Sequence, residues 1–100
     1  MNDKKITIIA TFKAKEGMEG ELREELLKLI EPSRSDEGCI DYHLHQGSDD
    51  PTIFIFYENW LNREFLERHS ATPHVRQFRA KAAGLLEKPA EIVALHRISG

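Results

Sequence analysis

The residues with the clearest chemical potential lie in the second half of the chain, around one glutamate. Alternate side chains of an extended strand share a face, so Glu58 lies with three aromatic residues, Phe54, Phe56 and Trp60. A carboxylate in such surroundings is costly unless it is hydrogen-bonded, and we expect Glu58 to have a partner or a raised pKa. One charged group in an apolar wall is typical of small-molecule sites. A structural glutamate, bonded to the backbone or to a histidine on a covering helix, would show the same pattern.

Trp60, His69 and His74 extend this set of candidates. Trp60 is either a core anchor or a wall on which a ligand stacks, and its indole N–H needs a partner in both cases. His69 and His74 lie on either side of an expected break between two helices, where a loop could gate a cavity. A histidine there can accept or donate a proton near neutral pH.

Two other groups of reactive residues favour structural roles. Cys39 begins an expected strand, a place more typical of a small buried hydrophobic residue than of a catalytic thiol. His43 and His45 share a strand face with Asp41 and could bind a metal, but such a row is more often a solvated surface, so we predict no metal site. The chain also contains no GxSxG motif, no phosphate-binding glycine loop and no CxxC pair.

Length, charge and hydropathy exclude several classes of protein. A chain of 100 residues fits one domain, which we expect over residues 4–98. A net charge of −3 argues against a nucleic-acid partner, which would require a basic surface. The longest unbroken apolar run, Ile53 to Tyr57, is too short to span a membrane. No signal segment opens the chain and its one cysteine allows no internal disulfide, so we expect a cytoplasmic protein.

Periodicity predicts the elements that position these residues. Strand-like alternation covers four segments, 6–12, 39–46, 52–60 and 91–98. Helical spacing begins at Met18 and continues to Pro32, which we expect to kink or end that helix. A short helix follows over 61–69, and Thr72-Pro73 opens another that Lys88-Pro89 stops. The order β-α-β-β-α-α-β predicts an α+β, ferredoxin-like split βαβ fold with an antiparallel sheet.

The third expected strand is apolar on both faces. Opposite the face of Glu58 lie Ile53, Ile55, Tyr57 and Asn59. One face of a small antiparallel sheet normally meets water, so a second subunit is the simplest cover for this one. We therefore expect a homodimer.

An ordered set of short motifs resembles the antibiotic biosynthesis monooxygenase (ABM) family, including its small quinol monooxygenases. The resemblance spans about residues 6–98. Its matching features, in chain order, are Gly17, Ser33-Arg34, Glu37-Gly38-Cys39-Ile40-x-Tyr42, Tyr57-Glu58-x-Trp60, His69, Thr72-Pro73-His74 and Pro89.

The resemblance implies a subunit whose sheet pairs with that of a second subunit in a dimeric α/β barrel. It also implies oxidation of a small quinol or polyphenolic ring by molecular oxygen, with no flavin, haem or metal cofactor. By resemblance Trp60 lines the cavity, and Glu58 and His69 form its polar corner, so we expect these three residues to be catalytic. Either face of the sheet could line the cavity. The expected substrate contacts therefore include residues of both faces and one helix residue, namely Tyr42, Phe56, Tyr57, Asn59 and His74.

Departures from the family pattern narrow the range of reactions that we expect of this chain. Some polyketide-oxidising relatives carry an asparagine where this chain has Phe56. Haem-degrading relatives use a first-strand asparagine and a helix histidine, where this chain offers Ala10 and Phe78 or Arg79, so haem degradation is not expected.

Two alternatives stay open from the sequence. A related branch isomerises a phosphorylated autoinducer-2 derivative, which would require Arg34, Arg76 or Arg79 to face the cavity. A non-catalytic dimeric module that binds a small apolar ligand is the other alternative.

Overall fold

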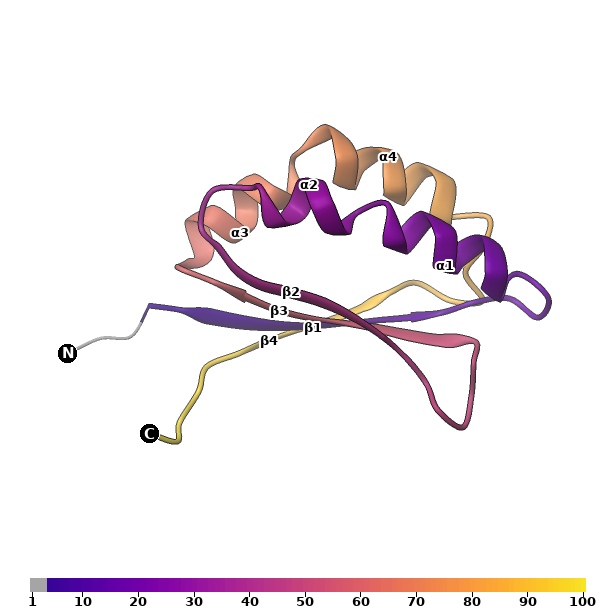
Figure 1. Ribbon diagram of the computed structural model, residues 1–100, viewed down its shortest axis with the longest axis horizontal. Helices are drawn as coiled ribbons and strands as arrows, with labels where there is room; N and C mark the ends of the chain where they lie inside the picture. The colour runs from indigo at the N-terminus through magenta and orange to yellow at the C-terminus, as the bar shows by residue number, and fades with distance from the viewer. Residues whose placement is uncertain (1–3) are drawn as a thin grey trace.

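The computed structural model describes residues 4–100, in which a four-stranded antiparallel sheet carries helices on one face (Figure 1). The strands are β1 (Ile6–Lys13), β2 (Cys39–Gln46), β3 (Ile53–Trp60) and β4 (Glu91–Leu95), in the spatial order β2-β3-β1-β4. The helices are α1 (Glu19–Leu27), α2 (Ile30–Arg34), α3 (Arg63–Ser70) and α4 (Pro73–Ala82). This confirms the α+β, ferredoxin-like fold. No helix among residues 4–100 combines the length and apolar character that crossing a membrane requires.

The two faces of the sheet separate the side chains of β3 as alternation predicts. Phe54, Phe56, Glu58 and Trp60 are buried beneath the helices. Their neighbours on β1 are apolar as well, since Ala10 lies opposite Phe56 and Ile8 lies opposite Glu58. Glu58 is therefore a charged residue in the middle of the core layer.

The first helix is interrupted one turn before its proline. α1 ends at Leu27, and α2 begins at Ile30 and contains Pro32. Pro32 has no N–H to donate to the carbonyl of Lys28, four residues earlier, and its ring crowds that carbonyl, so the ladder breaks there. The proline then lies in the first turn of α2, where backbone N–H groups have no intrahelical partner in any case. The expected kink is present, but it lies upstream of Pro32 and the chain re-enters a helix.

Other element boundaries differ from those expected. α3 begins at Arg63 because the Asn62 side chain caps it by accepting from the Phe65 N–H. α4 starts after the Thr72 cap as predicted but ends at Ala82, well before Pro89. β4 covers 91–95 rather than 91–98. A bulge between Cys39 and Asp41 interrupts the alternation of β2, and Ile40 is 43% exposed although simple alternation would place it on the buried face of Tyr42.

The turn before β2 lies directly on α3. Gly38 has a positive φ of 84°, and a Cβ at this position would overlap the Phe65 side chain. Glycine satisfies both requirements because it adopts positive φ readily and has no Cβ. The close approach brings Asp36 over α3, on which His69 follows Phe65 by one helical turn.

The helices cover one face of the sheet and leave the other face uncovered (Figure 1), and the uncovered face carries exposed apolar side chains. Tyr57 of β3 is exposed there, as are Val93 and Leu95 of β4. Register places all three on the same face, since Val93 pairs with Ile9 and Ile9 pairs with Tyr57. These side chains form an apolar surface on the face of the sheet opposite the helices.

We expect Gly38→Ala to lower the free energy of unfolding by about 2 kcal/mol or more, because it adds a strained φ and an overlap with Phe65. Urea unfolding measures the change. The control is Gly20→Ala in α1, where a Cβ meets no atom within 4 Å, and a gain of roughly 0.5–1 kcal/mol is expected. Equal effects at the two positions would contradict the close approach.

Candidate functional site

A cavity of about 380 Å³ lies between the sheet and the second helix pair. Its floor comes from β1, β2 and β3, with Ala10, Tyr42, Phe56 and Glu58 among the lining residues. Its roof comes from α3 and α4, with His69 and Phe78 among the lining residues. The lining is mostly apolar with a few polar groups, which is the composition of a small-molecule site.

Small side chains keep the cavity unfilled. Ala10 on the floor and Ala82 on the roof are buried at positions where a larger residue would occupy the space. Phe12 packs edge-on against Phe56 and Phe78, with ring centroids 6.2 and 5.5 Å away. These edge-on contacts are a favourable arrangement for aromatic rings. They give the cavity a rigid aromatic boundary.

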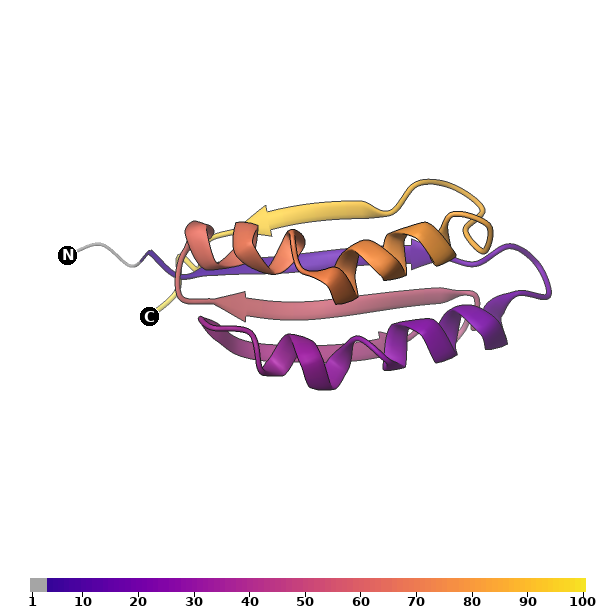
Figure 2. The ribbon, with the colours of Figure 1, turned by 90° about the horizontal axis from the view of Figure 1, so that it is seen from above.

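The mouth lies toward β4. Arg79, Ala83 and Ile92 line the cavity and are exposed, and Ile92 is 61% exposed. Seen from above, β4 lies outside the cover of the helices (Figure 2). A ligand would therefore enter along this edge, past the Arg79 guanidinium.

Glu58 is the buried acid of the site. It is 5% exposed, and its Oε1 accepts a hydrogen bond of 2.9 Å from the Trp60 indole N–H. Burial raises the pKa of Glu58 to about 7, and the bond from Trp60 opposes that rise only in part. Near neutral pH this carboxyl is therefore populated in both its protonated and ionised forms, so it can donate or accept a proton.

His69 is the buried histidine in the cavity wall. Its ring packs against the Trp60 ring at a tilt of 35°, with centroids 4.5 Å apart, and lines the cavity. Burial lowers the pKa of His69, while its bond to Asp36 acts in the opposite direction. The neutral imidazole is thus favoured at pH 7, the form that can accept a proton.

Asp36 joins the two histidines of the predicted set. Its Oδ2 lies 2.8 Å from His69 Nδ1 and 2.9 Å from His74 Nε2. These are the lengths of charge-assisted hydrogen bonds. Asp36 offers one oxygen and each histidine offers one nitrogen, and these three atoms lie within 4.8 Å of one another. Such a set would also suit a divalent cation. The hydrogen bonds alone account for the observed separations.

The structure brings together only part of the predicted site. Tyr42 and Phe56 line the cavity with Glu58 and His69. Trp60 was expected to line it too, but it is 0% exposed and lies behind Glu58, to which it donates its hydrogen bond. Trp60 is the last residue of β3, and its ring lies against His69 of α3.

Three expected substrate contacts lie outside the cavity lining. Tyr57 and Asn59 are on the opposite face of the sheet, because they alternate with Phe56 and Glu58. Asn59 bonds to Thr7 and Asp41 there. His74 is on the outer side of Asp36 and reaches the cavity only through that residue and His69.

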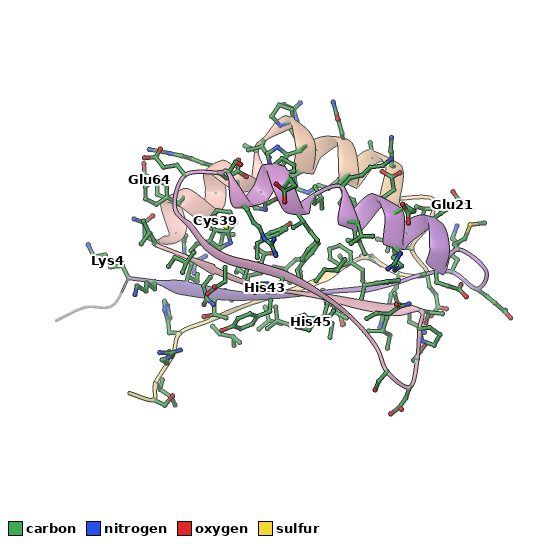
Figure 3. The ribbon with its side chains drawn as sticks, in the orientation of Figure 1. Lys4, Glu21, Cys39, His43, His45 and Glu64 are labelled. Atoms are coloured by element: carbon green, nitrogen blue, oxygen red, sulfur yellow. The ribbon has the colours of Figure 1, made fainter. Side chains whose placement is uncertain are left out.

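Figure 3 shows the residues that the sequence favoured for structural roles. His43 and His45 follow each other along β2 and are exposed, and His43 approaches Asp41 and Arg34. Cys39 is half-buried, and burial together with the charge of Glu58 raises the pKa of its thiol to about 11. The thiolate is therefore disfavoured at neutral pH, which fits a packing role for Cys39.

Asp36 is the functional candidate that sequence reasoning missed. It lies 33 residues from His69 in the chain, so no local spacing connects the two. The available signal was indirect. Two histidines at a helix break need an acceptor, and a short acidic turn precedes the glycine at position 38.

Comparison with known proteins identifies a family. Residues 5–81 match the model of the antibiotic biosynthesis monooxygenase family. The solved structure of PA3566 from Pseudomonas aeruginosa superposes with a TM-score of 0.91 at 36% identity, covering 96% of each chain. Rv0793 from Mycobacterium tuberculosis, provisionally named a monooxygenase, is 30% identical over 90% of this chain and 88% of its own length. Its solved structure superposes with a TM-score of 0.90 and covers 96% of this chain and 97% of its own.

A cyanobacterial relative is longer than this chain. The uncharacterized protein sll1783 of Synechocystis is 38% identical over 90% of the chain, but the match spans only 61% of that relative's length.

The raised pKa of Glu58 predicts a specific dependence of stability on pH. Because the protonated form is favoured in the folded state, its stabilising effect is full below pH 4.5 and is lost as pH rises to about 7. Glu58→Gln keeps an acceptor for Trp60 but cannot ionise. We compare the free energies of unfolding of the variant and the wild type. Between pH 4.5 and pH 8 their difference should change by roughly 2–3 kcal/mol in favour of the variant.

Urea unfolding at several pH values measures this difference, in which the contributions of other groups cancel. Glu64→Gln, at an exposed position on α3, is the control and should track the wild type. A wild type and Glu58→Gln variant with parallel pH profiles would show that Glu58 titrates normally.

Proposed function

Because this chain belongs to the antibiotic biosynthesis monooxygenase family, we propose that it oxidises a small quinol or other hydroxylated aromatic molecule with molecular oxygen and without a cofactor. The observation that carries the proposal is the apolar cavity with His69 and Glu58 in its wall. An electron-rich phenolate can reduce oxygen itself. Such a reaction requires from the protein a dry cavity, a proton acceptor and hydrogen bonds to the oxyanion.

The residues suit each step of this reaction. Neutral His69 accepts the proton of the substrate hydroxyl, and the phenolate transfers an electron to oxygen. A carbon–oxygen bond then forms at a ring carbon that bears hydrogen. The peroxide anion takes the proton that His69 holds and becomes a hydroperoxide. Neutral His69 then removes the hydrogen of that ring carbon as a proton while the O–O bond breaks, which leaves a carbonyl and releases hydroxide. Protonated Glu58 supplies the proton that converts this hydroxide to water, and the proton on His69 restores Glu58 to its protonated form.

The electrons and atoms balance without an external reductant. The substrate gives up two hydrogens and gains one oxygen atom, while the second oxygen atom leaves as water. The apolar wall formed by Phe12, Phe56 and Phe78 suits a flat aromatic ring. The polar corner holds the reacting hydroxyl.

The cavity offers few positive groups that could bind a phosphorylated substrate. Of the three arginines considered for it, only Arg79 lines the cavity, where it also donates to the Ser70 carbonyl. Arg34 instead donates to the Tyr42 carbonyl and lies beside His43. Both the isomerase and the non-catalytic binding module are separable from the oxygenase by experiment.

We expect protein-dependent oxygen consumption with members of a panel of quinols and naphthols, measured with a chelator present against a protein-free control. His69→Gln should lower the rate roughly 10²–10⁴-fold, the usual contribution of a general base. Glu67→Gln, on the exposed side of α3, should leave it unchanged. No consumption above the control would contradict the proposal. Thermal stabilisation by a sugar phosphate would then favour the isomerase, and stabilisation by an aromatic ligand alone the binding module.

We also propose that two copies associate through the apolar sheet face that carries Ile55, Tyr57 and Val93. Sedimentation at micromolar concentration should give a mass of twice 11.5 kDa. Ile55→Asp should convert the protein to the monomer, because a charge would be buried at the interface. A wild-type mass of 11.5 kDa would contradict the association.

A further inference from the structure

We infer that Asp36 is a positioning residue, which holds His69 in the tautomer that carries its hydrogen on Nδ1 and leaves the Nε2 lone pair for a ligand in the cavity. His74 holds the carboxylate from the other side. The catalytic meaning of this arrangement rests on the proposed function, whereas the tautomer itself does not.

The geometry at one oxygen atom determines the tautomers. Oδ2 of Asp36 lies within hydrogen-bond distance of both His69 Nδ1 and His74 Nε2. A carboxylate accepts hydrogen bonds and donates none, so each of these nitrogens carries the hydrogen. In neutral His69 the second ring nitrogen, Nε2, then has the free lone pair. A base that acts on a ligand in the cavity requires this tautomer.

The backbone around Asp36 fixes the carboxylate. The Asp36 N–H donates to the Ser33 carbonyl, and the Asp36 carbonyl accepts from the Cys39 N–H. Gly38 lets this turn lie against Phe65 on α3, one helical turn from His69. The Asp36 side chain is 18% exposed, so little water competes for its oxygen.

His74 restrains the carboxylate further. It lies one residue after the N-terminus of α4, close to the Thr72 cap that begins the helix. Its bond to Oδ2 leaves Asp36 with partners on both helices, α3 and α4. A carboxylate bound from two directions cannot rotate away when His69 changes its protonation state.

The charges around His69 fit a base that is neutral at rest. Asp36 favours its protonated form, while His74 and Arg79, both on α4, oppose it. When His69 accepts a proton, the carboxylate stabilises the imidazolium that forms, as in other acid–histidine pairs. Asp36 thus acts through His69 and does not itself contact the ligand.

Long-range proton–nitrogen NMR of the full chain reports which ring nitrogen carries the hydrogen, and it needs no substrate. We expect the wild-type protein to show His69 with hydrogen on Nδ1 at pH 8. In Asp36→Asn the amide can donate as well as accept, so this preference should be lost. Glu37→Gln, one residue along and exposed, is the matched control and should retain the wild-type spectrum.

A wild-type spectrum with hydrogen on His69 Nε2 would overturn the inference, and this result does not depend on whether any variant folds. An unchanged tautomer in folded Asp36→Asn would overturn it as well. Stoichiometric loss of both histidine signals on adding micromolar zinc would assign a metal site instead.

Oxygen consumption separates this inference from the proposed function. Asp36→Asn should lower the rate roughly 10–100-fold, as removal of a residue that orients a functional histidine does. A wild-type protein with the expected tautomer and no oxygen consumption would contradict the proposed function alone. An active protein that holds hydrogen on Nε2 would contradict the positioning role alone.

Discussion

The hydrogen bond between Asp36 and His69 is the interaction on which the arrangement of the site depends. It links the turn before β2 to α3, and the second bond, to His74, extends the link to α4. The roof of the cavity is built from α3 and α4, while Tyr42 of its floor follows the same turn on β2. The pair that orients the base therefore also joins the elements that enclose the cavity.

Placing Glu58 in the core layer has an energetic cost that packing does not require. An apolar residue at this position would remove the cost of burying a carboxyl, yet the strand presents an acid beside Trp60. Shifted acids and bases that share a cleft are typical of active sites, although structural networks also produce them. In this protein the raised pKa of Glu58 keeps part of that carboxyl protonated near neutral pH, and the lowered pKa of His69 favours its neutral imidazole, so one group can donate a proton and the other can accept one.

Much of the fold follows from periodicity. A side-chain period of two assigns Phe56 and Glu58 to one face of β3, and the assignment holds because the pairing of β3 with β1 has no bulge. Helix boundaries were predicted less well, because the break near Lys28 and the cap at Asn62 depend on single residues. The bulge that exposes Ile40 has no signal in the alternation itself.

The site was predicted only in outline. Glu58 and His69 could be chosen because each is a titratable residue expected to be buried or at a helix break. Asp36 could not, because its role arises where the Gly38 turn meets α3, a contact that no local pattern encodes. Trp60 was expected in the cavity wall, but its ring is buried between Glu58 and His69, a placement that depends on the packing of α3 against β3.

The origin of the oxygen atom in the product tests the central claim most directly. The protein, freed of metal by a chelator, is incubated with an oxidisable quinol or naphthol under oxygen-18 gas in ordinary water. We expect one labelled oxygen atom per product molecule, formed only when protein is present. Product whose new oxygen comes from water, or labelled product formed equally without protein, would contradict it.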